Sequence, residues 1–152
     1  MTTTTEPLQR LTELIRDIRV AMLTTATEAG DLRSRPMVPC HTDPEGGLWF
    51  FTRVGDAKVE EARLHPHVNV SFADPDHNRY VSVSGTAALV RDRAMVAELW
   101  DESARAWLPG GPDDPELALL RVVVQRAEYW DGPDGTACDD VKVDVHPEGG
   151  AT

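Results

Sequence analysis

Hydrophobic residues near the start of the chain recur at steps of three and four positions. The residues in this pattern are Leu8, Leu11, Leu14, Ile15 and Ile18. Residues with this spacing share one face of a helix, so the pattern predicts a helix over about residues 7–19. Because an apolar helical face has to be buried, we expect this helix to cap a barrel or to pack on a partner.

A hairpin is predicted directly after this helix. Residues 20–25 form a short apolar run, residues 28–31 have turn composition, and a second extended run covers residues 32–40. Pro36 and Pro39 cannot donate ladder hydrogen bonds, so the second strand is expected at an edge or a bulge where it passes them. Its backbone would then be free to face a ligand.

Further extended and helical patterns alternate along the rest of the chain. The extended runs are 48–52, 68–72, 80–90 and 117–130, and the helical spacings are 57–64 and 93–107. Gly85 predicts a bulge within its run, and the Pro- and Gly-rich residues 109–115 predict an ordered loop. Strands joined mainly by turns favour a mainly β, α+β fold, an antiparallel barrel with helical caps, over an alternating βαβ sheet.

Length and composition indicate one domain. The chain has 152 residues, of which 41% are hydrophobic and 27% charged. We expect a disordered tract over residues 1–7, the domain over residues 8–132 and a loose acidic tail over residues 133–152, in which only Val141, Val143 and Val145 suggest a weak strand. No apolar run approaches the roughly 20 residues of a spanning helix, and the first residues lack an export signal, so a cytoplasmic protein is expected.

The charge balance excludes some ligands and restricts others. A formal net charge of -11 argues against binding to DNA or RNA, and a small anion would need a local basic pocket. Cys40 and Cys138 are too few for a paired-cysteine zinc site or a disulfide framework. The Cys40-His41 pair and the histidines at 65 and 67 match no defined metal site, so no metal is expected.

Motifs of hydrolases are absent from the sequence. Gly110-Gly111 is followed by a proline and two aspartates rather than by a phosphate loop, and no Gly-x-Ser-x-Gly elbow occurs. Basic residues instead gather in one third of the chain, at Arg33, Arg35 and Lys58. Arginine offers a planar fork and lysine a point charge, and together they could hold a phosphomonoester. The alternative is that these residues are solvated surface charges.

Several blocks of sequence together carry a family pattern. They are Ser34-Arg35-Pro36-Met37, Leu48-Trp49-Phe50-Phe51-Thr52, Lys58, residues 68–75 and 80–85, Leu99-Trp100, residues 107–111 with 113–115, and residues 128–131. In this order and spacing the chain resembles the general stress protein 26 group of pyridoxamine 5'-phosphate oxidase-like proteins. The resemblance covers Leu8 to about Gly132.

The resemblance implies both a fold and a cofactor. The fold is a six-stranded antiparallel split β-barrel with helical caps, which forms a homodimer with two FMN sites at the subunit interface. Arg35 and Lys58 are implied to bind the FMN phosphate, with Thr52 beside them. The strand residues implied to run along the isoalloxazine ring are Ser34, Arg35, Pro36 and Met37. Phe51 is implied to pack nearby, and Trp107 to cover the flavin or its substrate side.

One residue departs from the family pattern. Members usually carry a serine or a similar small hydroxyl residue two positions before the lysine, where this sequence has Asp56. A carboxylate so close to a phosphate lowers its affinity unless Asp56 points away or pairs with Lys58 or Arg53. FAD and a deazaflavin are therefore alternatives to FMN.

The resemblance leaves the reaction open between three functions. The first is a flavin-dependent oxidoreductase for a small molecule, with a reduced nicotinamide as one candidate electron donor. The second is a non-catalytic flavin-binding or flavin-buffering stress protein, and the third is a deazaflavin-dependent reductase. An open pocket over the ring would favour the first function, and a site closed by Trp107 would favour the second.

Overall fold

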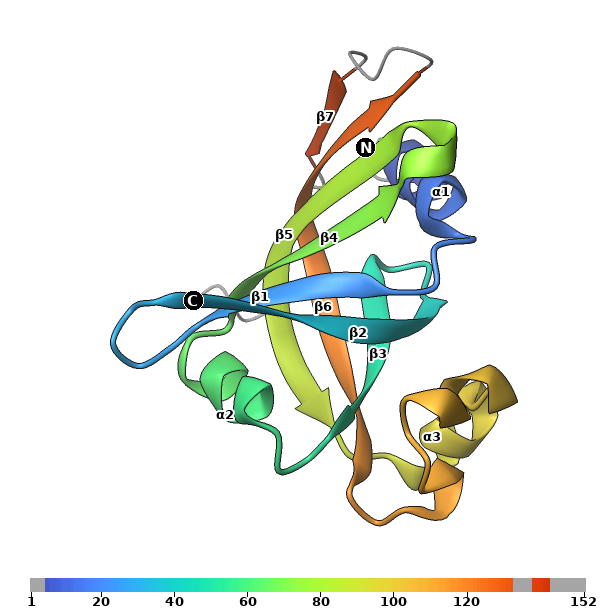
Figure 1. Cartoon of the computed structure of the whole chain (residues 1–152). Coiled ribbons are helices and arrows are strands. Elements are labelled where there is room, and N and C mark those ends of the chain that lie inside the picture. The colour runs from blue at the N-terminus through green and yellow to red at the C-terminus, as the bar shows by residue number, and fades with distance from the viewer. Residues whose placement is uncertain (1–4, 133–137, 143–152) are drawn as a thin grey trace.

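The computed structural model describes residues 5–132 and 138–142 (Figure 1). Its helices are α1 (Thr5–Ile15), α2 (Ala57–Leu64) and α3 (Arg93–Leu99), and its short 3-10 turns are η1 (Pro75–His77), η2 (Glu102–Ala106) and η3 (Gly111–Asp113). Its strands are β1 (Ala21–Ala26), β2 (Leu32–Thr42), β3 (Gly47–Arg53), β4 (His67–Asp74), β5 (Arg79–Val90), β6 (Leu117–Asp131) and β7 (Cys138–Lys142).

Six of the strands close into an antiparallel barrel. The sheet order is β3-β2-β1-β4-β5-β6-β7, and β3 also pairs with β6, so the first six strands form a ring. This closure confirms the six-stranded barrel expected from the sequence. The first half of β6 pairs with β3, and its second half pairs with β7, from Arg126 opposite Lys142 to Trp130 opposite Cys138.

Strand β7 lies within the segment that we expected to be a loose tail. Residues 138–142 are part of the sheet, and the candidate weak strand is therefore real at Val141. Val143 and Val145 lie outside the described residues, as does the remainder of residues 133–152. At the other end of the chain, α1 begins at Thr5, inside the tract that we expected to be disordered.

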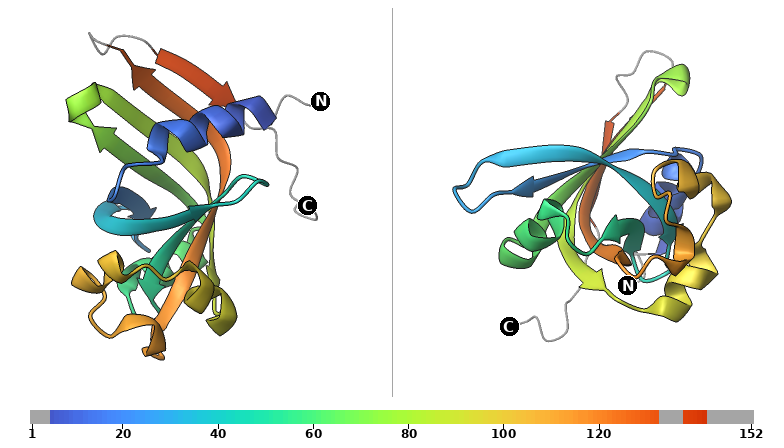
Figure 2. Two further views of the ribbon diagram at one scale, coloured as in Figure 1. Left: turned by 90° about the vertical axis from the view of Figure 1, so that its right-hand side faces the viewer. Right: turned by 60° about the horizontal axis from the view of Figure 1, so that its bottom comes forward.

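Strand β2 changes partner half-way along its length. Its first half pairs with β1, ending at Met37 opposite Ala21, and its second half pairs with β3, beginning at Val38 opposite Phe51. Pro36 therefore has a strand on one side only, and the register shifts next to Pro39. Both observations confirm the expected edge and bulge. The β1–β2 hairpin extends away from the barrel, with α2 beside it (Figure 2).

A bulge bends the long β5–β6 pair, as expected at Gly85. Ser84 lies opposite Arg126 and Gly85 opposite Val124, so Gln125 is an extra residue on β6. A Cβ atom on Gly85 would collide with the carbonyl oxygen of Val123. Only glycine allows the two backbones to approach so closely.

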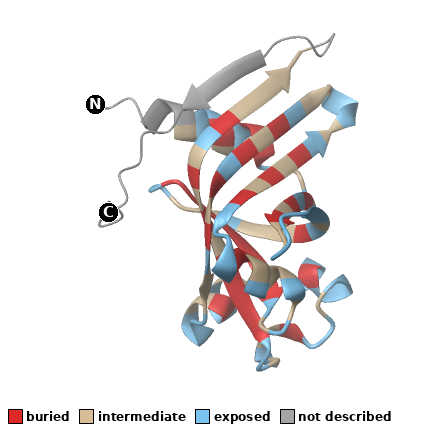
Figure 3. Cartoon of the chain, turned by 90° about the vertical axis from the view of Figure 1, so that its left-hand side faces the viewer, coloured by how far each residue is buried: buried red, intermediate tan, exposed pale blue. Residues whose placement is uncertain are grey.

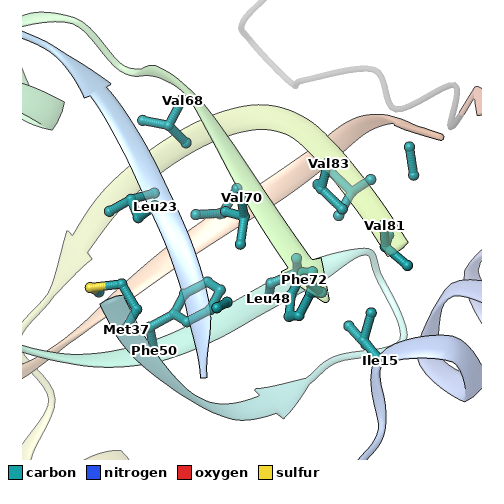
Figure 4. Packing of buried hydrophobic residues seen from close by; sticks show 14 of the residues in the cluster. Ile15, Leu23, Met37, Leu48, Phe50, Val68, Val70, Phe72, Val81 and Val83 are labelled. Atoms are coloured by element: carbon teal, nitrogen blue, oxygen red, sulfur yellow. The ribbon is translucent and has the colours of Figure 1, made fainter. Parts of the chain in front are cut away.

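The barrel interior is filled by alternate residues of its strands. The side chains that meet there include Leu23, Val70 and Val83 from neighbouring strands and Phe50 from β3 (Figure 4). The same alternation appears as buried and exposed bands along the strands in Figure 3. Helix α1 adds its apolar face to this core and ends at Ile15, four residues earlier than its spacing predicts.

A second cluster of buried residues lies under α3 and the turns that follow it. Its buried members are Trp49, Phe51, Val96, Ala104, Leu117 and Leu119. The sequence predicts one helical segment over residues 93–107, but Trp100 is extended, and a new turn starts where the Asp101 carboxylate accepts from the Ser103 amide at 3.0 Å. The described helices include none long and apolar enough to cross a bilayer.

Candidate functional site

The predicted site residues are distributed along β2 and around its neighbours. Helix α2 covers the β1–β2 hairpin at one end of this region, and at the other end Trp107 lines a cleft together with Val38 and Pro39. The site therefore has a basic end and an aromatic end. Arg35 and Pro39 are four residues apart, which corresponds to about 13 Å along an extended strand.

Arg35 is held in place at the basic end by three acceptors. Its Nη1 donates to the Thr25 hydroxyl and, at 3.2 Å, to the Arg33 carbonyl, while its Nη2 donates to Glu61 Oε1 at 2.9 Å. The Arg35 side chain is only 17% exposed, so its ion pair with Glu61 is shielded from solvent more than a surface pair is. Arg35 is thus an ordered cation rather than a mobile surface charge.

Glu61 connects this end of β2 to α2. Its Oε1 accepts from the Thr25 hydroxyl at 2.6 Å as well as from Arg35, and its Oε2 lies 3.4 Å from Arg33 Nη1. The hydrogen bond from Thr25, followed by the one from Arg35, holds the pKa of Glu61 below its usual value. Sequence reasoning missed both Glu61 and Thr25. The available signal is the position of Glu61 three residues after Lys58, which places the two on one side of a helix.

Lys58 pairs with the residue that departs from the family pattern. Its Nζ lies 2.8 Å from Asp56 Oδ2, and the Lys58 side chain is 13% exposed. Asp56 is also the N-cap residue of α2, but its side chain makes no hydrogen bond to the helix. Arg53, the other partner considered for Asp56, instead donates to Asp114 at 2.6 Å. Asp56 therefore pairs with Lys58, which is one of the arrangements considered from the sequence.

Thr52 is buried at the end of β3, shortly before α2 begins. It is 1% exposed, and among the described residues its hydroxyl is the one buried side-chain polar atom without a hydrogen-bond partner. A buried hydroxyl without a partner is costly, and such groups mark places where an unseen ligand or water could bind.

The predicted ring-binding strand presents two kinds of surface. Ser34 lies on the outer face of the sheet, where its hydroxyl is 2.6 Å from that of Thr24, and Pro36 is exposed on the same face opposite Met22. Met37 points the other way and is 3% exposed within the core. Met37 can therefore reach a ligand only through its backbone.

The aromatic end separates the two predicted aromatic residues. Phe51 is buried and makes an edge-on contact with Trp100, with ring centroids 5.5 Å apart. Trp107 is 53% exposed and lines an open cleft of about 570 Å³ together with Val38, Pro39 and other residues. Trp107 is therefore accessible to a bound molecule, whereas Phe51 is buried and packs behind the residues that line the site.

Cys40 and the potential metal ligands can be compared with what thiolate and metal chemistry require. Burial raises the pKa of the Cys40 thiol to about 12, and its sulfur donates to the Trp49 carbonyl at 3.4 Å. A thiol with such a pKa is not a nucleophile at neutral pH. Within residues 5–132 and 138–142, no three His, Cys, Asp or Glu residues are grouped closely enough to hold a metal ion.

Comparison with known proteins identifies the family. A family model described as pyridoxamine 5'-phosphate oxidase like matches residues 6–144. The chain belongs to this family. The resemblance stated from the sequence blocks is thereby confirmed.

Solved structures of pyridoxamine 5'-phosphate oxidase-like proteins share the fold. A Clostridium acetobutylicum protein related to general stress protein 26 has a TM-score of 0.75 and 22% identity, covering 91% of this chain and 96% of its own. The general stress FMN/FAD binding protein of Xanthomonas citri has a TM-score of 0.69 and 29% identity, covering 95% of this chain and 99% of its own.

A fungal relative is longer than this chain. The Neurospora crassa protein bli-3 is 30% identical over 134 residues, which are 82% of this chain. The match spans 64% of the length of that protein.

The residues of this pyridoxamine 5'-phosphate oxidase-like chain fit a phosphate ester at the basic end. Three cations, Arg33, Arg35 and Lys58, are set against two carboxylates, Asp56 and Glu61. These five side chains together carry a net positive charge, although the net charge of the whole chain is -11. The start of α2 also lacks a side-chain cap, and backbone N–H groups at a helix start favour anions.

Proposed function

We propose that the protein binds FMN through β2 and α2 and is a flavin-dependent oxidoreductase acting on a small molecule. The observation that carries this proposal is the ion pair between Arg35 and Glu61 of α2. It lies at the half of β2 that pairs with a strand on one side only. A phosphate on Arg35 and Lys58 would leave the rest of the cofactor to extend along β2. The Xanthomonas citri relative, described as FMN/FAD binding, supports a flavin and makes FAD the alternative.

The unpaired edge of β2 suits a flat ring with polar edges. Backbone N–H and C=O groups need partners, and no described strand supplies them along this edge before Val38. The isoalloxazine ring carries donors and acceptors that could take this role. Ser34 and Pro36 would flank it, Met37 would contribute its backbone, and Phe51 would support the strand from behind.

The cleft at Trp107 supports a catalytic role over binding alone. A bound flavin supplies the redox chemistry, taking electrons from one molecule and giving them to another. The chain has to bind the cofactor, orient it and leave one face accessible. Trp107 is half-exposed at an open cleft of about 570 Å³, which has room for a small molecule beside the ring.

A second copy of the chain is part of the proposal. Met22 and Tyr80 are large apolar residues that are 39% and 37% exposed on the sheet. A homodimer would bury such residues and bring a second subunit to the cofactor. The supporting argument for this state is family membership together with these exposed side chains.

A flavin titration of paired variants tests the site. Replacing Arg35 and Lys58 together by Ala should raise the Kd for FMN by about 100-fold, because two charge-assisted contacts to the phosphate are lost. The control replaces Arg63 and Arg91 by Ala, which removes the same charge from exposed positions. FMN fluorescence quenching gives the Kd, and circular dichroism checks the fold.

The outcomes separate the proposed function from its alternatives. An unchanged Kd in the Arg35/Lys58 variant would remove the site assignment. Saturable FMN binding without oxidation of a reduced nicotinamide or reduction of any tested acceptor would indicate a non-catalytic flavin-binding protein. Binding of a deazaflavin in preference to FMN would indicate the deazaflavin-dependent reductase.

A further inference from the structure

We infer that Glu61 is a positioning residue for the cofactor phosphate: it fixes Arg35 so that one edge of the guanidinium group stays open to a phosphate ester. This inference rests on the proposed function, because the phosphate belongs to the flavin proposed above. It concerns a residue that neither the sequence blocks nor family membership assigns to the site.

The donors of Arg35 show which edge is open. A guanidinium group has five N–H donors in a fixed fork. Three of them are used within the described part of the chain, two on Nη1 and one on Nη2. The Nε–H and the second Nη2–H remain, and these two lie side by side on one edge. Two parallel N–H groups are the arrangement that binds two oxygens of a phosphate.

Glu61 and Thr25 occupy the neighbouring edge, which lies between Nη1 and Nη2. Glu61 Oε1 and Thr25 Oγ1 are 2.6 Å apart, and they accept from Nη2 and Nη1 of Arg35 respectively. Two oxygens so close together match the fork at the end of the guanidinium group. The Arg33 carbonyl accepts the remaining Nη1 hydrogen. Glu61 therefore binds the same Nη2 nitrogen whose second hydrogen belongs to the open edge, and its negative charge lies beside that edge without occupying it.

This arrangement prepares Arg35 before a ligand arrives. A free arginine side chain loses much rotamer freedom when it binds an anion. Arg35 is already ordered by acceptors from a strand and a helix, and Glu61 is itself only 14% exposed. The opposing effect is the repulsion between the Glu61 carboxylate and the phosphate. We place positioning above repulsion, because the Glu61 carboxylate is already paired with the cations of Arg35 and Arg33, which offset its charge.

Two substitutions at Glu61 separate position from charge. Glu61→Gln removes the charge and keeps an oxygen that accepts from Arg35, whereas Glu61→Ala removes both. The matched controls are Glu60→Gln and Glu60→Ala, since Glu60 is the neighbouring residue of α2 and pairs with Arg63 at the surface. Each variant is titrated with FMN and with riboflavin, which has the same ring and no phosphate.

The expected result is specific to the phosphate. Glu61→Ala should raise the Kd for FMN by about tenfold, and Glu61→Gln should stay within about threefold of the unsubstituted protein. Both Glu60 variants should match the unsubstituted protein. The Kd for riboflavin should be the same in all five proteins, and thermal unfolding followed by circular dichroism should show that each is folded.

Three results would overturn the inference, and they differ from one another. Equal FMN affinity in Glu61→Ala and Glu60→Ala would show that Glu61 does not act on the phosphate. Tighter binding in both Glu61 variants would make Glu61 a competitor of the phosphate rather than its positioning residue. An unsubstituted, folded protein that binds neither FMN nor riboflavin would remove the proposed function, and this inference with it.

Discussion

Asp56 decides how much of the Lys58 charge is available to an anion. Its carboxylate lies 2.8 Å from Lys58 Nζ and does not cap α2, so its main interaction is with the lysine. A phosphate on Lys58 has to share that cation with Asp56 or displace it. If the proposed phosphate site is correct, we expect Asp56 to lower its affinity without removing the site.

Replacing Asp56 by Ser is expected to tighten FMN binding. The variant frees Lys58 from its carboxylate and restores a hydroxyl at the N-cap position, where serine can accept from a helix N–H. The Kd for FMN should fall by about three- to tenfold, as measured by fluorescence quenching. Asp76→Ser, at an exposed position on η1, is the control for loss of one negative charge. An unchanged Kd would mean that Lys58 does not contact the phosphate.

Single residues of the site were predictable in so far as their type suggests their chemistry. Arg35 and Lys58 stand out in the sequence because basic residues are informative in an acidic chain, and Asp56 stands out because it departs from the family pattern. Thr25 and Glu61 do not stand out, because their role depends on contacts with Arg35 across 10 and 26 positions. No periodic pattern encodes such contacts. The roles of Thr25 and Glu61 are visible only in the structure, where α2 packs against the β1–β2 hairpin.

For helices, the predicted bounds were accurate where the sequence itself contains residues that end the helix. Helix α2 has the predicted bounds because a His-Pro pair ends it. The prediction for residues 93–107 was wrong in its middle, because the apolar spacing continues through Trp100 while the Asp101 side chain starts a separate turn. A side chain that hydrogen-bonds to the backbone ahead of it competes with the helix in a way that periodicity does not reveal.

The close approach of β5 and β6 at Gly85 leads to a prediction about stability. Gly85→Ala should lower the free energy of unfolding by about 2–4 kcal/mol, because the new methyl group would meet the Val123 carbonyl and force the strands apart. Urea denaturation followed by tryptophan fluorescence measures the change. Gly55→Ala is the control, since its nearest atom would be a Glu116 carboxylate oxygen at 3.7 Å. Equal stability of the two variants would contradict the account of the bulge.

At the level of the whole molecule, six extended runs joined by turns were enough to predict a barrel. The pairing that closes it joins residues 47–53 to residues 117–123, and the sequence contains no local sign of that pairing. It follows from the need to cover two open edges of an apolar sheet. Strand β7 was predicted only as a weak candidate, because its residues are mostly polar and it adds to the sheet outside the closed ring.

The proposed homodimer leads to a prediction for the assembled protein. Met22 is exposed on the outer face of β1, directly opposite Pro36 of the proposed flavin strand. If a second subunit covers this face, Met22→Glu should place a charge in an apolar contact and convert the dimer to a monomer. Light scattering should give about twice the chain mass of 16.7 kDa for the unsubstituted protein and about 16.7 kDa for the variant.

The same variant tests whether the flavin needs both subunits. If each site lies at the interface, the Met22→Glu monomer should bind FMN at least tenfold more weakly, although Arg35 and Lys58 are intact. Ala97→Glu, at an exposed position of α3, is the control for an added charge. A monomer with unchanged FMN affinity would mean that one chain holds the cofactor alone. An unsubstituted protein that is monomeric at all concentrations would exclude the dimer, and the open cleft at Trp107 would then face solvent in the working protein.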